Sequence, residues 1–265
     1  MRCGACGFAF IPQGVARRED GSSIYEGDTT LFVADEQSDY YRDDSTIDAA
    51  RGKLRWIRQL APGGGQLLDI GASFGYFARE AAASFDARGI EPTALTVAWG
   101  REHLQAPIEV GSIYDERADF AGRFDVITMF DVIEHLPDPP GALDHVRAWL
   151  KPGGKLFLTT PDTGALVAKL LDKQWYYIDL TEHISLFNRR NLQQLLGERG
   201  FRVVDARTIG RRYKLSYIER RFGQLAADRP LLKIVHAALL PLRLAGGLRI
   251  PINLRDVMGM AAERA

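Results

Sequence analysis

Hydrophobic and polar positions follow two different periods along most of the chain, and their order predicts the elements of the fold. Short apolar runs typical of buried strands occupy 66–71, 87–91, 108–111, 124–130, 155–160, 201–208 and 257–263. Apolar positions at helical spacing lie between them, over 74–84, 93–102, 141–150 and 189–199. A further helix is expected before the first strand, with Ser45 or Thr46 as its N-cap. Alternating strands and helices predict an α/β fold, a doubly wound, mostly parallel seven-stranded sheet with helices on both faces.

Composition is consistent with one main core. The chain has 265 residues, 46% of them hydrophobic, which is enough to bury one substantial core. Four regions are expected: an irregular N-terminal segment over 1–45, the core over 46–210, a basic and apolar helical insertion over 211–250, and a final strand within 251–265. Because the sequence shows no apolar run of membrane-spanning length and no secretory signal, a cytoplasmic location is the expectation.

Charge is balanced over the whole chain but not along it. The formal net charge is zero, so nothing in the total charge favours nucleic acid as a partner. The stretch 207–249, however, carries ten basic residues against two acidic ones and contains the apolar run 231–240. Basic residues around an apolar helix can dock on an anionic membrane surface. Packing on the domain, or on a second copy in a homodimer, explains the same pattern, so a membrane contact through 211–250 and a homodimer both stay open.

Two cysteines near the N-terminus, Cys3 and Cys6, have a spacing that suits a metal knuckle better than a disulfide. A tetrahedral zinc site needs four ligands, and no second cysteine pair or nearby histidine follows in the sequence. We therefore predict no metal site within a single chain.

The loop after the first expected strand has the features of a ligand-binding turn. In an open α/β sheet ligands bind beyond the carboxyl ends of the strands, and here Asp69 is followed by Gly71 and Gly75. These glycines allow a tight turn and a close backbone approach. A dinucleotide site would need glycines also at positions 73 and 76, where Ser73 and Tyr76 stand, so a nicotinamide or flavin cofactor is disfavoured.

Later strand ends add polar groups at the same edge. The second strand ends at Glu91, whose carboxylate can accept hydrogen bonds from both hydroxyls of a ribose. The fourth strand runs directly into the segment Asp-Val-Ile-Glu-His-Leu over 131–136. The fifth is preceded by a turn sequence, Lys-Pro-Gly-Gly over 151–154.

Together these motifs resemble the class I S-adenosylmethionine-dependent methyltransferases, whose first motif is an acidic residue followed by three alternating glycines. The resemblance covers about 67–208 and the final strand, and it implies the Rossmann-like fold of that family with S-adenosyl-L-methionine as cofactor. Ser73 departs from the pattern, since it replaces the middle glycine. The residues that the resemblance places against the cofactor are Asp69, Gly71, Ala72, Ser73 and Gly75 at the amino-acid side, Glu91 at the ribose, Ser112 and Ile113 at the adenine, and Phe130 and Asp131 along the near wall.

Two outlying segments resemble one branch of this family, which modifies hydroxyls of sugars and other small molecules. The segment 181–187 precedes a helix that ends near Gly200, and 3–8 resembles the second half of an N-terminal Cys-rich ribbon. The resemblance implies O-methylation of a small molecule or glycan. Alternatives are C- or N-methylation of a related metabolite, or a scaffold that binds the cofactor without turnover. Nucleic acid is not expected, because the sequence has no Asn-Pro-Pro-Tyr-type motif.

A hydroxyl acceptor must lose a proton when it is methylated, and imidazole, which titrates near neutrality, suits that task. His135 and His183 both lie in loops expected near the carboxyl edge of the sheet, so both are candidate catalytic bases. The alternative for each is a loop histidine that caps a helix or orders a neighbour.

Overall fold

The computed structural model describes residues 3–4, 8–10, 44–178, 183–215 and 248–265. The chain divides into two compact units, Met1–Ile209 with Arg255–Ala265, and Gly210–Leu254. The elements of the first unit are, in chain order, β1 (Ala9–Phe10), α3 (Asp44–Leu60), β2 (Gln66–Ile70), α4 (Tyr76–Ala81), β3 (Asp86–Glu91), α5 (Ala94–Leu104), β4 (Ile108–Val110), η1 (Ala118–Phe120), β5 (Phe124–Phe130), η2 (Ile133–His135), α6 (Pro139–Trp149), β6 (Leu150–Pro161), α7 (Leu166–Leu171), η3 (Asp172–Gln174), β7 (Ser185–Leu186), α8 (Arg189–Glu198), β8 (Phe201–Thr208) and β11 (Val257–Arg264).

Seven of these strands form the predicted sheet, in the order β4-β3-β2-β5-β6-β11-β8. The pairs from β4 to β6 are parallel, and β11 runs antiparallel to both of its neighbours. The first strand of this sheet, β2, lies in its middle. The chain then adds β3 and β4 on one side of β2 and returns to place β5 on the other side. This reversal puts a topological switch point between β2 and β5, where a ligand site is expected in such sheets.

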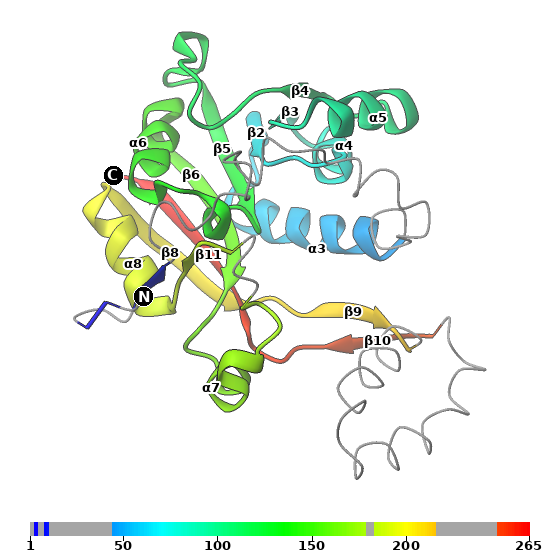
Figure 1. Cartoon of the computed structure of the whole chain (residues 1–265). Coiled ribbons are helices and arrows are strands. Elements are labelled where there is room, and N and C mark those ends of the chain that lie inside the picture. The colour runs from blue at the N-terminus through cyan, green and yellow to red at the C-terminus, as the bar shows by residue number, and fades with distance from the viewer. Residues whose placement is uncertain (1–2, 5–7, 11–43, 179–182, 216–247) are drawn as a thin grey trace, which may run out of the picture. The chain divides into compact units, whose positions relative to one another are not determined.

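Helices cover both faces of the sheet, as the sequence predicts (Figure 1). Alternate strand residues serve the two faces: Leu67 and Phe157 pack with α3 and α4, whereas Leu68 and Leu156 pack with α6 and α8. All four side chains are fully buried. Burial of such a side chain stabilises the fold by about 1.5–3 kcal/mol, so the two apolar layers fix the strand register and with it the carboxyl edge.

The turn sequence over 151–154 was expected to precede the strand at 155–160. It lies inside that strand instead, because β6 begins at Leu150. Phe124 pairs with Leu150 and Val126 with Lys155, so the residues between form an irregularity in the ladder. Gly153 has φ +73°, a left-handed conformation that glycine adopts without a Cβ penalty. The Pro-Gly-Gly signal thus marks a bulge in a continuous strand instead of its beginning.

The second unit contains β9 (Arg211–Lys214) and β10 (Arg249–Ile252), which pair antiparallel. Both ends of the insertion that was expected to be helical are therefore strands, and residues 251 and 252 belong to β10 instead of the last strand of the core. The apolar run over 231–240 lies outside the described residues. In the described part of the chain, no helix has the length and apolar character needed to span a bilayer.

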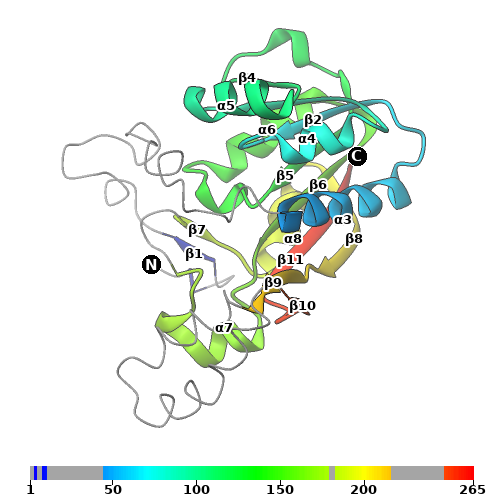
Figure 2. The same ribbon diagram turned by 90° about the vertical axis from the view of Figure 1, so that its right-hand side faces the viewer.

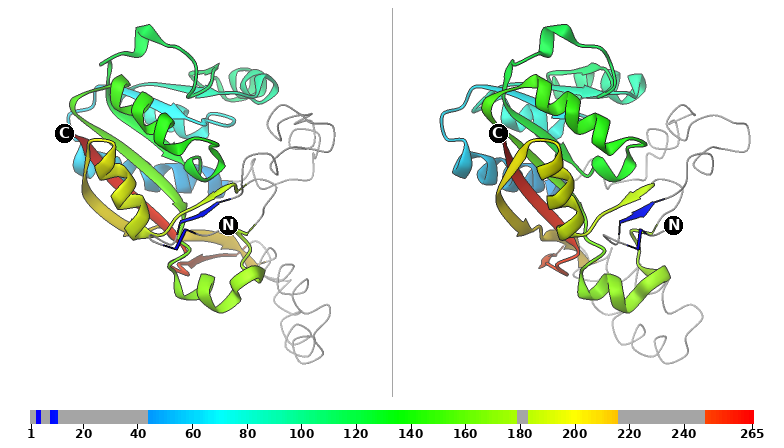
Figure 3. Two further views of the ribbon diagram at one scale, coloured as in Figure 1. Left: turned by 60° about the vertical axis from the view of Figure 1, so that its left-hand side comes forward. Right: turned by 90° about the vertical axis from the view of Figure 1, so that its left-hand side faces the viewer.

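Near the N-terminus, β1 pairs antiparallel with β7, and Figures 2 and 3 show the two short strands side by side. The Phe8 ring packs on Phe187, with centroids 5.0 Å apart. The Cys3 N–H donates to the Phe8 carbonyl at 2.7 Å. Cys6 lies outside the described residues, so the absence of a zinc site within one chain stays a prediction.

Candidate active site

The loop between β2 and α4 requires both of its glycines. Gly71 has φ +69° and Gly75 has φ +82°. A Cβ on Gly71 would stand 2.5 Å from Val132 Cγ2, and one on Gly75 would stand 2.4 Å from the Cβ of Ala106. Since real Cβ atoms do not approach so closely, any larger residue would displace the loop. The loop is thus packed between the segment that follows β5 and the residues before β4.

Glu91, at the end of β3, holds this loop in place. Its Oε2 accepts the N–H of Ser73 at 3.0 Å, and its Oε1 accepts the N–H of Thr93 at 3.1 Å. Ser73 itself adopts φ +49°, the left-handed conformation that glycine favours, which explains why the family pattern has glycine here. Each carboxylate oxygen has capacity for a second hydrogen bond, so the arrangement is compatible with the predicted ribose contact.

Asp69 lies near the end of β2, at the switch point between β2 and β5. Its carboxylate is almost completely buried and accepts a 2.6 Å hydrogen bond from Thr128 Oγ1. Burial raises the pKa of Asp69 to about 7, and the Thr128 hydrogen bond opposes this shift only in part. The structure therefore shows Asp69 as a buried acid bonded to the neighbouring strand β5, and its predicted contact with the cofactor stays a prediction.

The predicted near wall carries a cation that the sequence does not reveal. Lys53, from α3, places its Nζ 3.7 Å from Asp131 Oδ2 and 4.4 Å from the centroid of the Phe130 ring. Asp131 has φ +59° and accepts a 2.9 Å hydrogen bond from Thr159 Oγ1, which fixes its carboxylate. Lys53 is on a helix that precedes the whole sheet, so no motif spacing connects it with the strand ends.

At the end of β4, the turn predicted to contact adenine is held by its own side chains. The Ser112 N–H donates to Asp115 Oδ2 at 2.7 Å, and Ser112 Oγ accepts the N–H of Tyr114 at 3.2 Å. Ile113 is buried and belongs to the core cluster that also contains Ile90. Ile113 thus anchors the turn, and of the two residues predicted to contact adenine only Ser112 is partly exposed.

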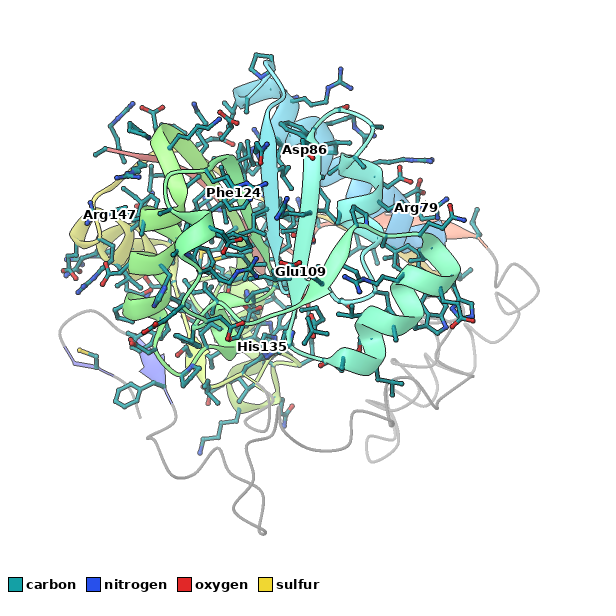
Figure 4. All side chains as sticks on the ribbon, turned by 90° about the horizontal axis from the view of Figure 1, so that it is seen from above. Arg79, Asp86, Glu109, Phe124, His135 and Arg147 are labelled. Atoms are coloured by element: carbon teal, nitrogen blue, oxygen red, sulfur yellow. The ribbon has the colours of Figure 1, made fainter. Side chains whose placement is uncertain are left out.

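The two predicted catalytic histidines meet in the structure. His135 ends η2, the single turn after β5, and His183 stands just before β7, yet their ring centroids lie 4.7 Å apart. In Figure 4, His135 lies at the opposite end of the sheet from Asp86 and Phe124, which begin β3 and β5. His135 is therefore at the carboxyl edge, close to Val132, which packs on the glycine loop.

A backbone carbonyl fixes the tautomer of His183. Its Nδ1 lies 2.7 Å from the carbonyl oxygen of Tyr177. Because a carbonyl oxygen only accepts hydrogen bonds, Nδ1 must carry the proton, and the neutral ring keeps its lone pair at Nε2. The ring is thus set up to accept a proton at Nε2.

Glu134 is a further residue of this cluster that the sequence did not single out. Its side chain is only 1% exposed. One carboxylate oxygen of Glu134 and one ring nitrogen each of His135 and His183 all lie within 4.8 Å of one another. In the sequence, Glu134 is noticeable only because it stands next to His135 after the fourth strand. Since the side chains of neighbouring residues often point in different directions, only the structure shows that Glu134 lies close to the two histidines.

The strand order with its single antiparallel strand, together with the acidic residue and glycine loop at the switch point, defines the class I S-adenosylmethionine-dependent methyltransferases. The chain matches the methyltransferase domain family over residues 46–206, more than half of its length, and belongs to that family.

Individual relatives agree with this assignment. The chain is 36% identical over 110 residues to the ubiquinone biosynthesis O-methyltransferase of Xanthomonas axonopodis pv. citri, covering 38% of this chain and 45% of that protein. The chain spans about half the length of the curated relatives it matches.

Solved structures show the same fold at low identity. An S-adenosylmethionine-dependent methyltransferase from Archaeoglobus fulgidus has a TM-score of 0.54 at 15% identity, over 84% of this chain and 99% of that one. A phosphoethanolamine N-methyltransferase from Haemonchus contortus, in complex with S-adenosylhomocysteine, has a TM-score of 0.55 at 17% identity, over 90% of this chain and 61% of that one. At these identities the likeness concerns the fold alone.

Proposed function

We propose that this protein transfers the methyl group of S-adenosylmethionine to a hydroxyl oxygen of a small molecule, with His183 as the base. The observation that carries the proposal is the position of His183 at the carboxyl edge, beside His135 and with its tautomer set by Tyr177. A hydroxyl acceptor needs a group that takes its proton, and this arrangement supplies one. The similarity to a protein named as an O-methyltransferase supports the same reaction.

The chain's residues fit the cofactor at three points. The loop 71–75 offers closely approachable backbone, and Glu91 offers carboxylate oxygens for a ribose. Lys53, next to Asp131, supplies a positive charge for the carboxylate of the methionine part. These assignments put the amino-acid end of the cofactor near the wall formed by Phe130 and Asp131.

S-adenosylmethionine would supply a methyl group on a positively charged sulfur, and the sulfide is a good leaving group that needs no further activation. The protein then has to align the acceptor and remove its proton. In the proposed reaction, His183 accepts the hydroxyl proton at Nε2 while Tyr177 holds the opposite nitrogen. The acceptor oxygen supplies the electron pair of the new bond to the methyl carbon.

Binding and turnover measurements test this function. Calorimetry should show binding of S-adenosylhomocysteine and none of NAD. Labelled S-adenosylmethionine should transfer its methyl group to oxygen in a panel of phenols, sugars and lipid-linked glycans. Binding of NAD without S-adenosylhomocysteine would contradict the proposal, and so would a methyl group found only on nitrogen or carbon.

Substitution of His183 tests the assignment of the base. A general base typically contributes ~10²–10⁴-fold, so His183→Ala should lower kcat by at least ~10²-fold. The dissociation constant for S-adenosylhomocysteine should change little, because the glycine loop and Glu91 account for the cofactor without His183. If His135→Ala lost turnover while His183→Ala kept it, the base would be His135.

A further inference from the structure

The cluster of Glu134, His135 and His183 combines two proton acceptors with one buried carboxyl group. The imidazole rings are tilted by 58°, with centroids 4.7 Å apart, and the Glu134 carboxyl lies within 4.8 Å of a nitrogen of each. Both histidines are partly exposed, whereas Glu134 is buried. The two bases can therefore reach an acceptor while the acid remains inside.

Elements of the fold hold the three groups together. Ile133, fully buried in the core, anchors η2 and thereby fixes Glu134 and His135. Ser185 Oγ donates to the Leu136 carbonyl at 3.4 Å, which connects β7 with the end of η2. The Tyr177 carbonyl orients His183 from the other side. The grouping thus results from three separate chain segments that are tied to the same edge.

Methyl transfer to a hydroxyl moves a positive charge. Before the reaction the charge is on the sulfonium; afterwards the sulfide is neutral, the acceptor is a neutral methyl ether, and the proton from the hydroxyl is on the base. The breaking S–C bond leaves its electron pair on sulfur, and the oxygen supplies the pair of the new C–O bond. An imidazolium formed at a partly buried site is unfavourable unless an opposite charge lies nearby.

We propose that Glu134 is a positioning residue that offsets the positive charge which His183 acquires, and that His135 shares the accepted proton. This inference rests on the proposed function and adds a residue to it. His183 remains the group that touches the acceptor, and Glu134 acts through the two imidazoles.

The charged groups around the cluster leave Glu134 as the acid that faces the histidines in the described residues. Asp131, on the chain just before η2, is paired with Lys53. Asp162, just after β6, is paired with Arg189 at 3.4 Å.

The elements packed on η2 add no further acid. β7 has no titratable side chain, and β6 has only Lys151 and Lys155, which pair with Asp125 and Glu263. Tyr177 is the remaining titratable neighbour, with its ring 6.0 Å from that of His183.

The test is the pH profile of kcat in Glu134→Gln. This variant keeps the shape of the side chain and removes its charge. Without the carboxylate, the histidine base should lose its proton more readily. The acidic midpoint of the profile should move down by at least ~1 pH unit, the low end of the effect of an opposite charge at 4–6 Å. The maximal rate should fall by roughly tenfold.

Two matched variants accompany the test. Glu134→Asp keeps the charge and should keep the wild-type midpoint. Glu263→Gln removes a carboxylate at the opposite end of the sheet, where it pairs with Lys155 and Arg202, and should leave the profile unchanged. Calorimetry with S-adenosylhomocysteine verifies that each variant is folded. An unmoved midpoint in folded Glu134→Gln would overturn the proposal.

NMR titration of the histidine ring resonances gives the same information without turnover. In Glu134→Gln, the titration midpoints of His135 and His183 should fall relative to wild type. If the midpoints fall but the protein methylates no hydroxyl, the role proposed for Glu134 is supported and the proposed function is wrong. If the enzyme turns over but the midpoints do not move, the role proposed for Glu134 is wrong. Loss of turnover with EDTA, restored by a divalent cation, would also overturn it, because a bound cation would occupy the lone pairs that accept the proton.

Discussion

At the scale of single residues, Asp69 is a buried acid whose ionisation couples to folding. Its carboxyl lies at the switch point between β2 and β5, with Thr128 as its hydrogen-bond donor. Burial raises its pKa from the usual 3.8 to about 7, so the folded protein retains a proton that the unfolded chain has lost. Between these two values the folded state binds more protons than the unfolded state.

The sign of the resulting pH dependence follows directly. The free energy of unfolding should fall as the pH rises from about 4 to about 7 and level off above that, with a total loss on the order of 4 kcal/mol from this group. Asp69→Asn keeps an oxygen that accepts from Thr128 and cannot ionise. Urea denaturation at pH 5 and pH 8 should therefore show a smaller pH dependence in the variant. Parallel pH dependence in the two proteins would mean that Asp69 does not titrate in this range.

Lys53 illustrates a candidate binding residue that only tertiary structure reveals. Its ammonium group lies beside Asp131 and over the Phe130 ring, at the side where the methionine part of the cofactor is proposed. We expect Lys53→Met to weaken S-adenosylhomocysteine binding by about 1–3 kcal/mol, the range for a hydrogen bond to a charged group or its loss. Arg55→Met, an exposed cation on the same helix, is the control. Calorimetry that finds equal affinities for both variants would remove Lys53 from the site.

At the scale of elements, the two-residue strands β1 and β7 connect residues near the N-terminus with the segment that follows His183. Ala9 pairs with Leu186, and Phe8 packs on Phe187 and stacks on Phe10 with centroids 5.8 Å apart. A pair this short has little stability of its own, so the aromatic packing must contribute most of it. Since β7 begins two residues after His183, this pairing helps to fix the position of His183.

Truncation of Phe8 tests this connection. Phe8→Ala should speed amide hydrogen exchange at Ser185 and Leu186 and lower kcat, with a smaller change in cofactor affinity. Phe8→Leu, which keeps an apolar side chain of similar reach, should retain most of the protection. Unchanged exchange in the Ala variant would show that β7 is ordered without the N-terminal segment.

The same scale shows which features the sequence could predict. The central strands of the sheet were predictable because they bury side chains such as Leu67 and Leu68 on both faces, which produces continuous apolar runs. The pairs β1–β7 and β9–β10 were not, since short strands have no such run and their partners are distant in the chain. The cofactor-side residues followed strand ends, but Lys53 and Glu134 became part of the site only through helix and turn placement.

At the scale of the whole molecule, the division into two units has an experimental consequence. The last strand of the core, β11, inserts between β6 and β8, so the chain must pass through the second unit before it completes the sheet. The second unit begins and ends with β9 and β10, which pair from Arg211 with Ile252 to Lys214 with Arg249. Beyond this ladder, the Leu215 N–H donates to the Leu248 carbonyl at 2.9 Å.

Excision of 216–247 tests whether the core depends on this segment. Leu215 and Leu248 lie opposite one another on antiparallel chains, and a two-residue Asn-Gly turn is the connection that such a pair favours. A protein in which Asn-Gly replaces 216–247 should fold, because all seven strands of the sheet, as described, come from other parts of the chain. Its affinity for S-adenosylhomocysteine should match that of the full chain within about threefold, or ~0.7 kcal/mol. If the membrane contact through 211–250 that the sequence leaves open exists, sedimentation with phosphatidylglycerol vesicles should be lost in the excised protein, with phosphatidylcholine vesicles as control. Loss of cofactor binding in a protein that still unfolds cooperatively would instead assign the excised segment to the cofactor site.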